Sequence, residues 1–209
     1  LDSMKATMKT LSAILICCFI STIQMYGENI QRPESENYVK GVEALNEGNP
    51  EAAYTYLNAE INEHPDNGYA HCYMALICNF CNDTKLALQA LNSSLELIPE
   101  ADTEYRSFAH YSRGVLLTNL KMWEHAEADL NEAIRLNPED VENYKSRAQL
   151  YFETERYEES LDDLTRALKL DSKADVNDLV LQLMAVAPTS EFMERITATY
   201  QQLDQVTIH

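Results

Sequence analysis

The chain has 209 residues and a net charge of −18 at neutral pH, with 34 acidic residues against 16 basic ones. A phosphate backbone would repel so acidic a chain, which excludes nucleic acid as a partner, and anionic lipid surfaces are excluded for the same reason. The charge could attract a basic partner, but a solvated outer face explains it more simply.

The first predicted element is a secretory signal peptide over residues 1–27. Lys5 and Lys9 precede an apolar run at residues 11–23, and cleavage is expected after Gly27. A membrane-spanning helix needs about 20 apolar residues, so we favour cleavage over an uncleaved membrane anchor.

The residues before the signal are interpreted as non-native. Met4 or Met8 is a better initiator than Leu1. Ile16 stands before Cys17, where a lipoprotein signal resembles a small residue before the lipidated cysteine, so lipidation is not expected.

After a linker at residues 28–33, the sequence repeats. Pro65 and Pro99 are 34 residues apart, and Pro138 follows 39 residues later. Two further sets of residues show the same spacing. One set is Ala53, Ala87, Ala126 and Ser160, and the other is Leu57, Leu91, Leu130 and Leu164. The longer interval contains the insertion "DTEYR" at 102–106, and such a period indicates a repeat architecture.

Each repeat is predicted to be a pair of antiparallel helices. Ala126, Leu130 and Ala133 lie on one helical stripe, whereas Glu127 and Asp129 point away from it. Turn signals separate the two helices of each pair: "EGNP" (47–50), "CND" (81–83), "LKMW" (120–123) and "TERY" (154–157). Prolines end the second helices. No stretch alternates with a period of two, so the fold class is all-α.

Small residues are predicted where the two helices of a pair cross. The first helices contribute Gly41, Ala75, Gly114 and Ala148, which face the column Ala53, Ala87, Ala126 and Ser160. Acidic residues such as Glu158, Glu159, Asp162 and Asp163 are expected at exposed positions.

The repeats resemble the tetratricopeptide repeat. Its pattern of small residue, alanine, apolar residue, alanine and proline is present in Gly114, Ala126, Leu130, Ala133 and Pro138. The resemblance implies a right-handed superhelical solenoid of about four helix pairs, with repeats at 34–67, 68–101, 107–140 and 141–174. Glu60, Ser94, Ser160 and Ser172 depart from the pattern.

Residues 175–209 are expected to form two further helices, at 175–188 and 190–206. They are either a C-terminal helical cap, which a repeat array needs, or a degenerate repeat truncated before further domains.

The sequence predicts no catalytic, metal or cofactor site. Cys78 is expected to be a small core residue, although a disulfide between Cys78 and Cys81, or one between molecules, stays open, as does the redox state of Cys72. The five histidines form no ligand set, and His71 and His110 are expected to pack at helix edges.

The family resemblance implies that first helices line a concave groove for a protein or peptide segment. The predicted groove residues are Tyr38, Val42, Leu45, Asn46, Tyr69, Leu76, Asn79, Phe80, Phe108, Tyr111, Val115, Asn119 and Phe152. Equivalent positions are held by Cys72, Thr118, Lys145, Gln149 and Glu153. The aromatic members could instead pack between neighbouring first helices, and this alternative stays open.

The predicted function is a non-catalytic binding scaffold, secreted or periplasmic, in a bacterial cell envelope. Relatives that bind acidic peptides resemble one another in a lysine and an asparagine where this chain has Tyr38 and Val42, so apolar or aromatic segments are the expected ligands. The alternatives are the repeat portion of a longer enzyme whose catalytic domain lies beyond His209, and a purely structural homo-oligomer.

Overall fold

The computed structural model describes residues 30–186 and 189–206, with the backbone alone for 200–206. The predicted signal peptide lies outside these residues. All regular structure in the described part is helical, which confirms the all-α prediction. The helices are α2 (Glu36–Asn46), α3 (Pro50–Glu63), α4 (Gly68–Phe80), α5 (Thr84–Leu97), α6 (Thr103–Asn119), α7 (Trp123–Leu136), α8 (Val141–Glu153), α9 (Tyr157–Leu170), α10 (Asn177–Val186) and α11 (Ser190–Val206).

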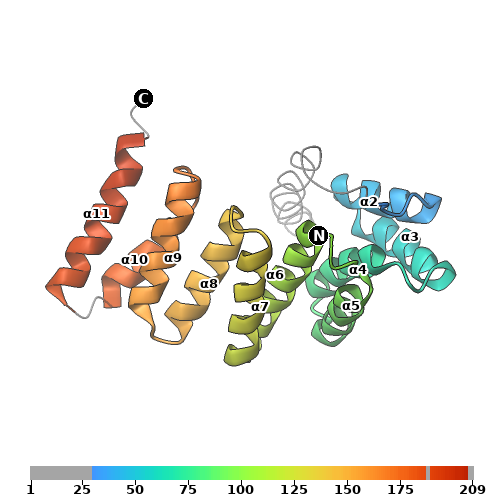
Figure 1. Cartoon of the computed structure of the whole chain (residues 1–209), viewed down its shortest axis with the longest axis horizontal. Helices are drawn as coiled ribbons and strands as arrows, with labels where there is room; N and C mark the ends of the chain where they lie inside the picture. The colour runs from blue at the N-terminus through green and yellow to red at the C-terminus, as the bar shows by residue number, and fades with distance from the viewer. Residues whose placement is uncertain (1–29, 187–188, 207–209) are drawn as a thin grey trace. The chain divides into compact units, whose positions relative to one another are not determined.

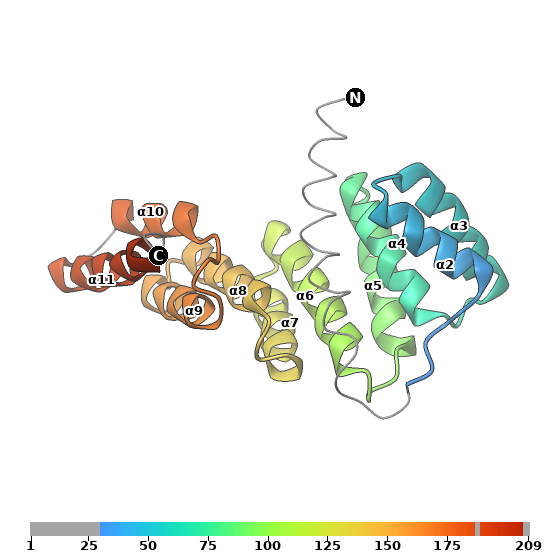
Figure 2. The same cartoon turned by 90° about the horizontal axis from the view of Figure 1, so that it is seen from above.

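The chain divides into two compact units, of which unit 1 ends at Tyr105 and unit 2 begins at Arg106. Unit 1 contains the pairs α2–α3 and α4–α5, whose helices pack side by side (Figures 1 and 2). In unit 2, α8 packs against α9, and α7 packs against α8. Each unit is described by itself.

Polar side chains begin most helices, because the first backbone N–H groups of a helix lack an internal partner. Asn49 accepts a hydrogen bond from the N–H of Ala52, and Pro50 occupies the first helical position, where its missing N–H needs no partner. The same role falls to Asn67 before α4, Asp83 before α5, Asp140 before α8 and Thr189 before α11.

Four helix-to-helix turns share one backbone conformation. The residues with φ between 58° and 70° are Gly48, Asn82, Lys121 and Glu155, one in each predicted repeat. After each, an N–H reaches back five residues to a carbonyl, as from Arg156 to Tyr151 at 2.8 Å. This is the Schellman ending, in which a left-handed residue satisfies the last carbonyls of the helix.

The insertion at 102–106 lengthens the start of α6. This helix begins at Thr103 and has 17 residues, whereas α4 and α8 each have 13. Asp102 caps it by accepting from the N–H of Tyr105 at 3.3 Å. The insertion therefore adds a helical turn that the other first helices lack.

The helices of a pair cross closely where small residues stand. A Cβ atom at Gly41 would lie 2.7 Å from Leu57 Cγ, and one at Gly114 would lie 2.7 Å from Leu130 Cγ. Real Cβ atoms do not approach that closely, so a side chain at either glycine would force the facing leucine to shift. On the facing helices Ala53, Ala87, Ala126 and Ser160 have no exposed surface.

Two aspartates lie inside the pairs, where the sequence pattern predicted exposure. Asp129 accepts from Arg113 Nε at 2.7 Å and from Arg113 Nη2 at 2.8 Å, and its other neighbour is His110 Nδ1 at 2.8 Å. Asp163 accepts from Arg147 Nε at 2.8 Å and from Nη2 at 2.7 Å. The predictions of outward-pointing carboxylates were wrong here, because an arginine of the first helix pairs with each one. A bidentate pair compensates for the burial of its charges.

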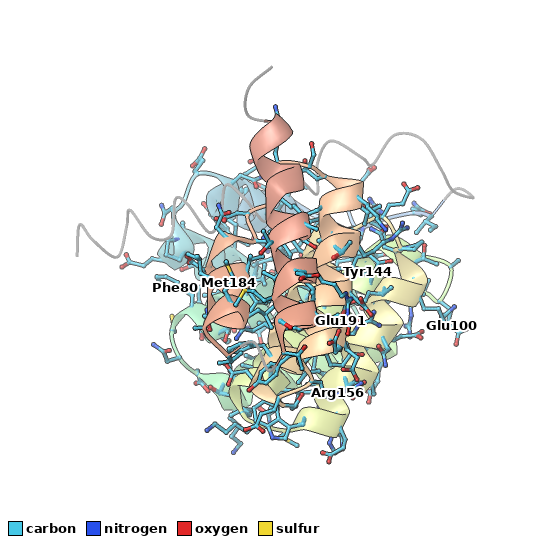
Figure 3. All side chains as sticks on the ribbon, turned by 90° about the vertical axis from the view of Figure 1, so that its left-hand side faces the viewer. Phe80, Glu100, Tyr144, Arg156, Met184 and Glu191 are labelled. Carbon is cyan, nitrogen blue, oxygen red and sulfur yellow. The ribbon has the colours of Figure 1, made fainter. Side chains whose placement is uncertain are left out.

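Helices α10 and α11 continue the core of unit 2. Leu183, Phe192 and Ile196 are fully buried in one cluster with Leu161 and Leu164 of α9. Figure 3 looks onto this terminal pair, where Met184 of α10 packs against the same cluster. The last two helices therefore cover apolar side chains of α9.

Replacing Ala126 by leucine should lower the free energy of unfolding by about 1–3 kcal/mol, because the larger side chain has no space at the crossing. Ala128→Leu is the matched control, since Ala128 lies exposed on the same helix, and it should change stability by less than about 0.5 kcal/mol. Urea unfolding followed by circular dichroism measures both. Equal midpoints would contradict the observed crossing.

Glu155→Gly should stabilise the protein by about 0.5–1 kcal/mol, because glycine adopts positive φ without the strain of a side chain. Glu153→Gly, two residues earlier and still helical, should destabilise it by about the same amount. The opposite signs in thermal melts test the left-handed turn, and a loss of stability in both variants would argue against it.

Candidate peptide-binding surface

In unit 1 the predicted groove residues divide by burial. Three are buried: Tyr38, Leu45 and Tyr69. The other five reach the surface and are called here the unit 1 surface: Val42, Asn46, Leu76, Asn79 and Phe80. Only these five can contact a ligand without rearrangement.

The buried tyrosines belong to a cluster of rings. The ring centroids of Tyr38 and Tyr73 lie 6.1 Å apart, and the ring of Tyr69 meets that of Tyr105 edge-on at 4.8 Å. The Tyr73 and Tyr105 hydroxyl oxygens are 3.0 Å apart, within hydrogen-bond distance. Burial raises the pKa of the Tyr73 phenol, so the phenol stays neutral.

The unit 1 surface repeats with the register of the helices. Val42 of α2 and Leu76 of α4 are equivalent positions, as are Asn46 and Phe80. The apolar members are half-buried, and the two asparagines beside them are exposed. Phe80, labelled in Figure 3, is the last residue of α4. The surface thus combines apolar contact area with amide donors and acceptors.

In unit 2 the aromatic groove residues mostly pack within the protein. Phe108 is buried and stacks on Tyr111, with ring centroids 6.3 Å apart. Burial, with the charge of Glu142 adding to it, raises the pKa of Tyr111 to about 12. Phe152 packs against the terminal core cluster, and its ring centroid is 5.7 Å from that of Tyr157.

Two groove residues of α6 remain at the surface beside the half-buried Tyr111: Val115 is half-buried and Asn119 is exposed. Of the equivalent positions, Cys72 and Thr118 are buried. In α8, Lys145 donates to Glu142 at 2.8 Å, and Gln149 donates to Glu153 at 2.9 Å.

The three described cysteines are free thiols. Cys78 is buried, as predicted for a core residue, and no disulfide joins it to the exposed Cys81. Burial raises the pKa of the Cys72 thiol to about 12, so it is protonated and unreactive at neutral pH.

Among the described residues, no group of three or more histidine, cysteine, aspartate or glutamate side chains could hold a metal ion. Within the same part of the chain, no helix is both long enough and apolar enough to cross a membrane.

Sequence reasoning missed a site at the end of unit 1. Arg32, in the predicted linker, bonds to Asp102 and Glu104 of the insertion. The available signal was the insertion itself, because it breaks the repeat and introduces two carboxylates and a tyrosine within four residues.

The chain matches known proteins along its repeats. The family model of the tetratricopeptide repeat matches residues 109–140 and 142–173. Human "Tetratricopeptide repeat protein 6" is 25% identical over 143 residues, covering 68% of this chain and 26% of that protein. A "Lipoprotein NlpI homolog" of Haemophilus influenzae is 31% identical over 87 residues, covering 42% of this chain and 28% of that protein. The chain thus spans about a quarter of the length of these curated relatives.

Solved structures share the fold. MamA from Desulfovibrio magneticus RS-1 aligns with a TM-score of 0.65 at 18% identity, covering 82% of this chain and 93% of that one. YrrB, described as a TPR protein with an unusual peptide-binding site, aligns with a TM-score of 0.59 at 20% identity, covering 70% and 73%. Residues 109–140 and 142–173 of the chain are thus tetratricopeptide repeats by the family model, and the solved structures share the fold of its helix pairs.

Proposed function

We propose that the chain is a non-catalytic scaffold that binds an extended, apolar or aromatic segment of a partner protein on the first helices of its repeats. One observation carries this proposal: the repeated, half-buried Val42, Leu76 and Phe80 beside the exposed amides of Asn46 and Asn79. Apolar side chains that remain partly exposed at equivalent positions of successive helices form a continuous contact for a chain lying across them.

The chemistry of this surface favours apolar ligands over acidic ones. An aromatic ring supplies a large contact area, and asparagine can donate to and accept from the backbone of an extended peptide. A ligand rich in carboxylates would meet no cation among the residues of the unit 1 surface, and the net charge of −18 would repel it.

The comparisons support a binding role and an envelope location as proposals. YrrB is described as having a peptide-binding site. The relative from Haemophilus influenzae is described as a lipoprotein, and an apolar run follows two lysines near the start of this chain. We therefore propose a secreted or periplasmic location in a bacterial cell envelope.

Phe80→Ala should weaken the capture of apolar and aromatic peptides from a synthetic library about tenfold, because truncating an aromatic contact at the centre of an interface costs about 1–2 kcal/mol of binding. Leu86→Ala is the control, because Leu86 is an exposed apolar residue of α5 in the same unit. Fluorescence anisotropy with the captured peptides measures binding, and circular dichroism checks the fold.

Two results would contradict the proposed ligand class. One is a wild-type protein that retains only acidic peptides. The other is Phe80→Ala unfolding as readily as the core variant Leu91→Ala, because Phe80 would then be a packing residue.

Export is tested separately. Expression from Met4 or Met8 in a bacterial host should yield a periplasmic or secreted product whose N-terminus lies near Glu28, because the leader is removed after Gly27. Mass spectrometry of the purified protein gives the terminus. An intact residue 11–23 segment on a protein retained in the cytoplasm would overturn the proposed location.

A further inference from the structure

Residues 30–35, which precede α2, have no helical structure and lie against unit 1 through the side chain of Arg32. Arg32 Nε is 3.2 Å from Asp102 Oδ2, and Nη2 is 3.3 Å from Asp102 Oδ1. Nη2 also donates to Glu104 Oε2 at 2.9 Å. The guanidinium carbon lies 4.6 Å from the centroid of the Tyr105 ring. Two carboxylates and an aromatic ring therefore surround one arginine.

The geometry of this pocket matches a guanidinium group rather than a generic cation. Asp102 meets Arg32 through two nitrogens at once, which the planar fork of arginine allows and the single ammonium of lysine does not. The ring of Tyr105 adds the stacking contact that arginine favours. Glu104 Oε2 accepts a hydrogen bond from Arg32 Nη2, the same nitrogen that contacts Asp102 Oδ1.

Asp102 is held in position independently of Arg32. Its side chain is 1% exposed, and it accepts from the Tyr69 hydroxyl at 3.0 Å and from the Tyr105 N–H at 3.3 Å. A buried carboxylate without a counter-charge is unfavourable. If Arg32 left, the pocket would favour another guanidinium in its place.

Arg32 is not fully buried. Its side chain is 24% exposed. No backbone hydrogen bond joins residues 30–34 to the helices within the part of the chain that the structure describes. The pocket is thus built into the helices of unit 1, while its occupant belongs to residues 30–34, which make none of the described backbone hydrogen bonds to those helices.

We propose that Asp102, Glu104, Tyr105 and Tyr69 form an arginine-binding pocket, which Arg32 fills in the free protein and which an arginine of an extended partner peptide fills in its place. This inference rests on the proposed peptide-binding function and names one side chain of the ligand. Tyr69, whose hydroxyl holds Asp102, stands at a predicted groove position. A basic ligand residue also suits the charge of the protein.

The attached arginine competes strongly. A short linker gives it an effective concentration on the order of millimolar, so a free peptide has to displace it. Removing the guanidinium should therefore expose the site without altering it.

The probe is a fluorescent synthetic peptide that copies residues 30–36, IQRPESE, with a second peptide carrying citrulline instead of arginine. Anisotropy with the full chain should show that Arg32→Ala binds the arginine peptide at least about tenfold more tightly than wild type does. The citrulline side chain is uncharged and close to arginine in shape, so the citrulline peptide should lose this gain. Equal binding by Arg32→Ala and wild type, or equal binding of the two peptides, would overturn the proposal.

A second pair of variants keeps the test decisive, because Asp102 also caps α6 and its replacement could unfold the first turn. In the Arg32→Ala background, Glu104→Gln should weaken the arginine peptide several-fold. Glu100→Gln removes the same charge at an exposed position nearby and should leave binding unchanged. Equal losses in both variants would show a general charge effect and refute the pocket.

The outcome separates the two proposals. If the arginine peptide behaves as expected while Phe80→Ala has no effect on library capture, the pocket stands and the unit 1 surface does not bind ligand. If Phe80→Ala weakens capture and the citrulline peptide binds as well as the arginine peptide, the surface stands and the pocket is refuted.

Discussion

The close crossing of the two helices in each pair is the contact on which the rest of the structure depends. Gly41 and Gly114 lack the Cβ atom that would collide with Leu57 and Leu130, and Ala126 faces the same crossing with no exposed surface. Leucines fill the interior beside these positions, and the turns within each of the four pairs are three residues long. The register of every other side chain, including those offered to a ligand, follows from this contact.

Local patterns predicted most of the framework. The prolines and the repeated small residues act within a few positions of one another, so their physical effects can be predicted from the sequence alone. The faces of Asp129 and Asp163 could not be read this way. Each aspartate looks exposed on its own helix and becomes a buried residue only through an arginine 16 positions earlier. The sequence did contain a signal for these pairs. Arg113 and Arg147 are separated by one repeat length of 34 residues, and so are Asp129 and Asp163.

The candidate site was predicted only in part, because its local positions follow from the repeat but the contacts between helices do not. The register of the repeat locates Leu76 and Phe80 on the first helix, but their exposure depends on what the neighbouring helix places beside them. Tyr69 has an equally suitable position and is buried, because the insertion supplies Tyr105 and Asp102 against it. Arg32 lies 70 residues from Asp102, and no periodicity connects the two. Departures from the repeat, rather than the repeat itself, created the most specific chemistry in unit 1.

The position that holds an arginine–aspartate pair in α6–α7 and α8–α9 holds Met74 and Ala90 in α4–α5, and both of these are buried. The ion pair and the apolar contact respond differently to temperature. Apolar burial weakens on cooling, because its driving force near room temperature is entropic. The desolvation penalty of an ion pair falls on heating, so the pairs of unit 2 gain in relative strength as temperature rises. At this one position, cooling therefore weakens the apolar contact of α4–α5 more than the ion pairs of α6–α7 and α8–α9, and heating favours the ion pairs.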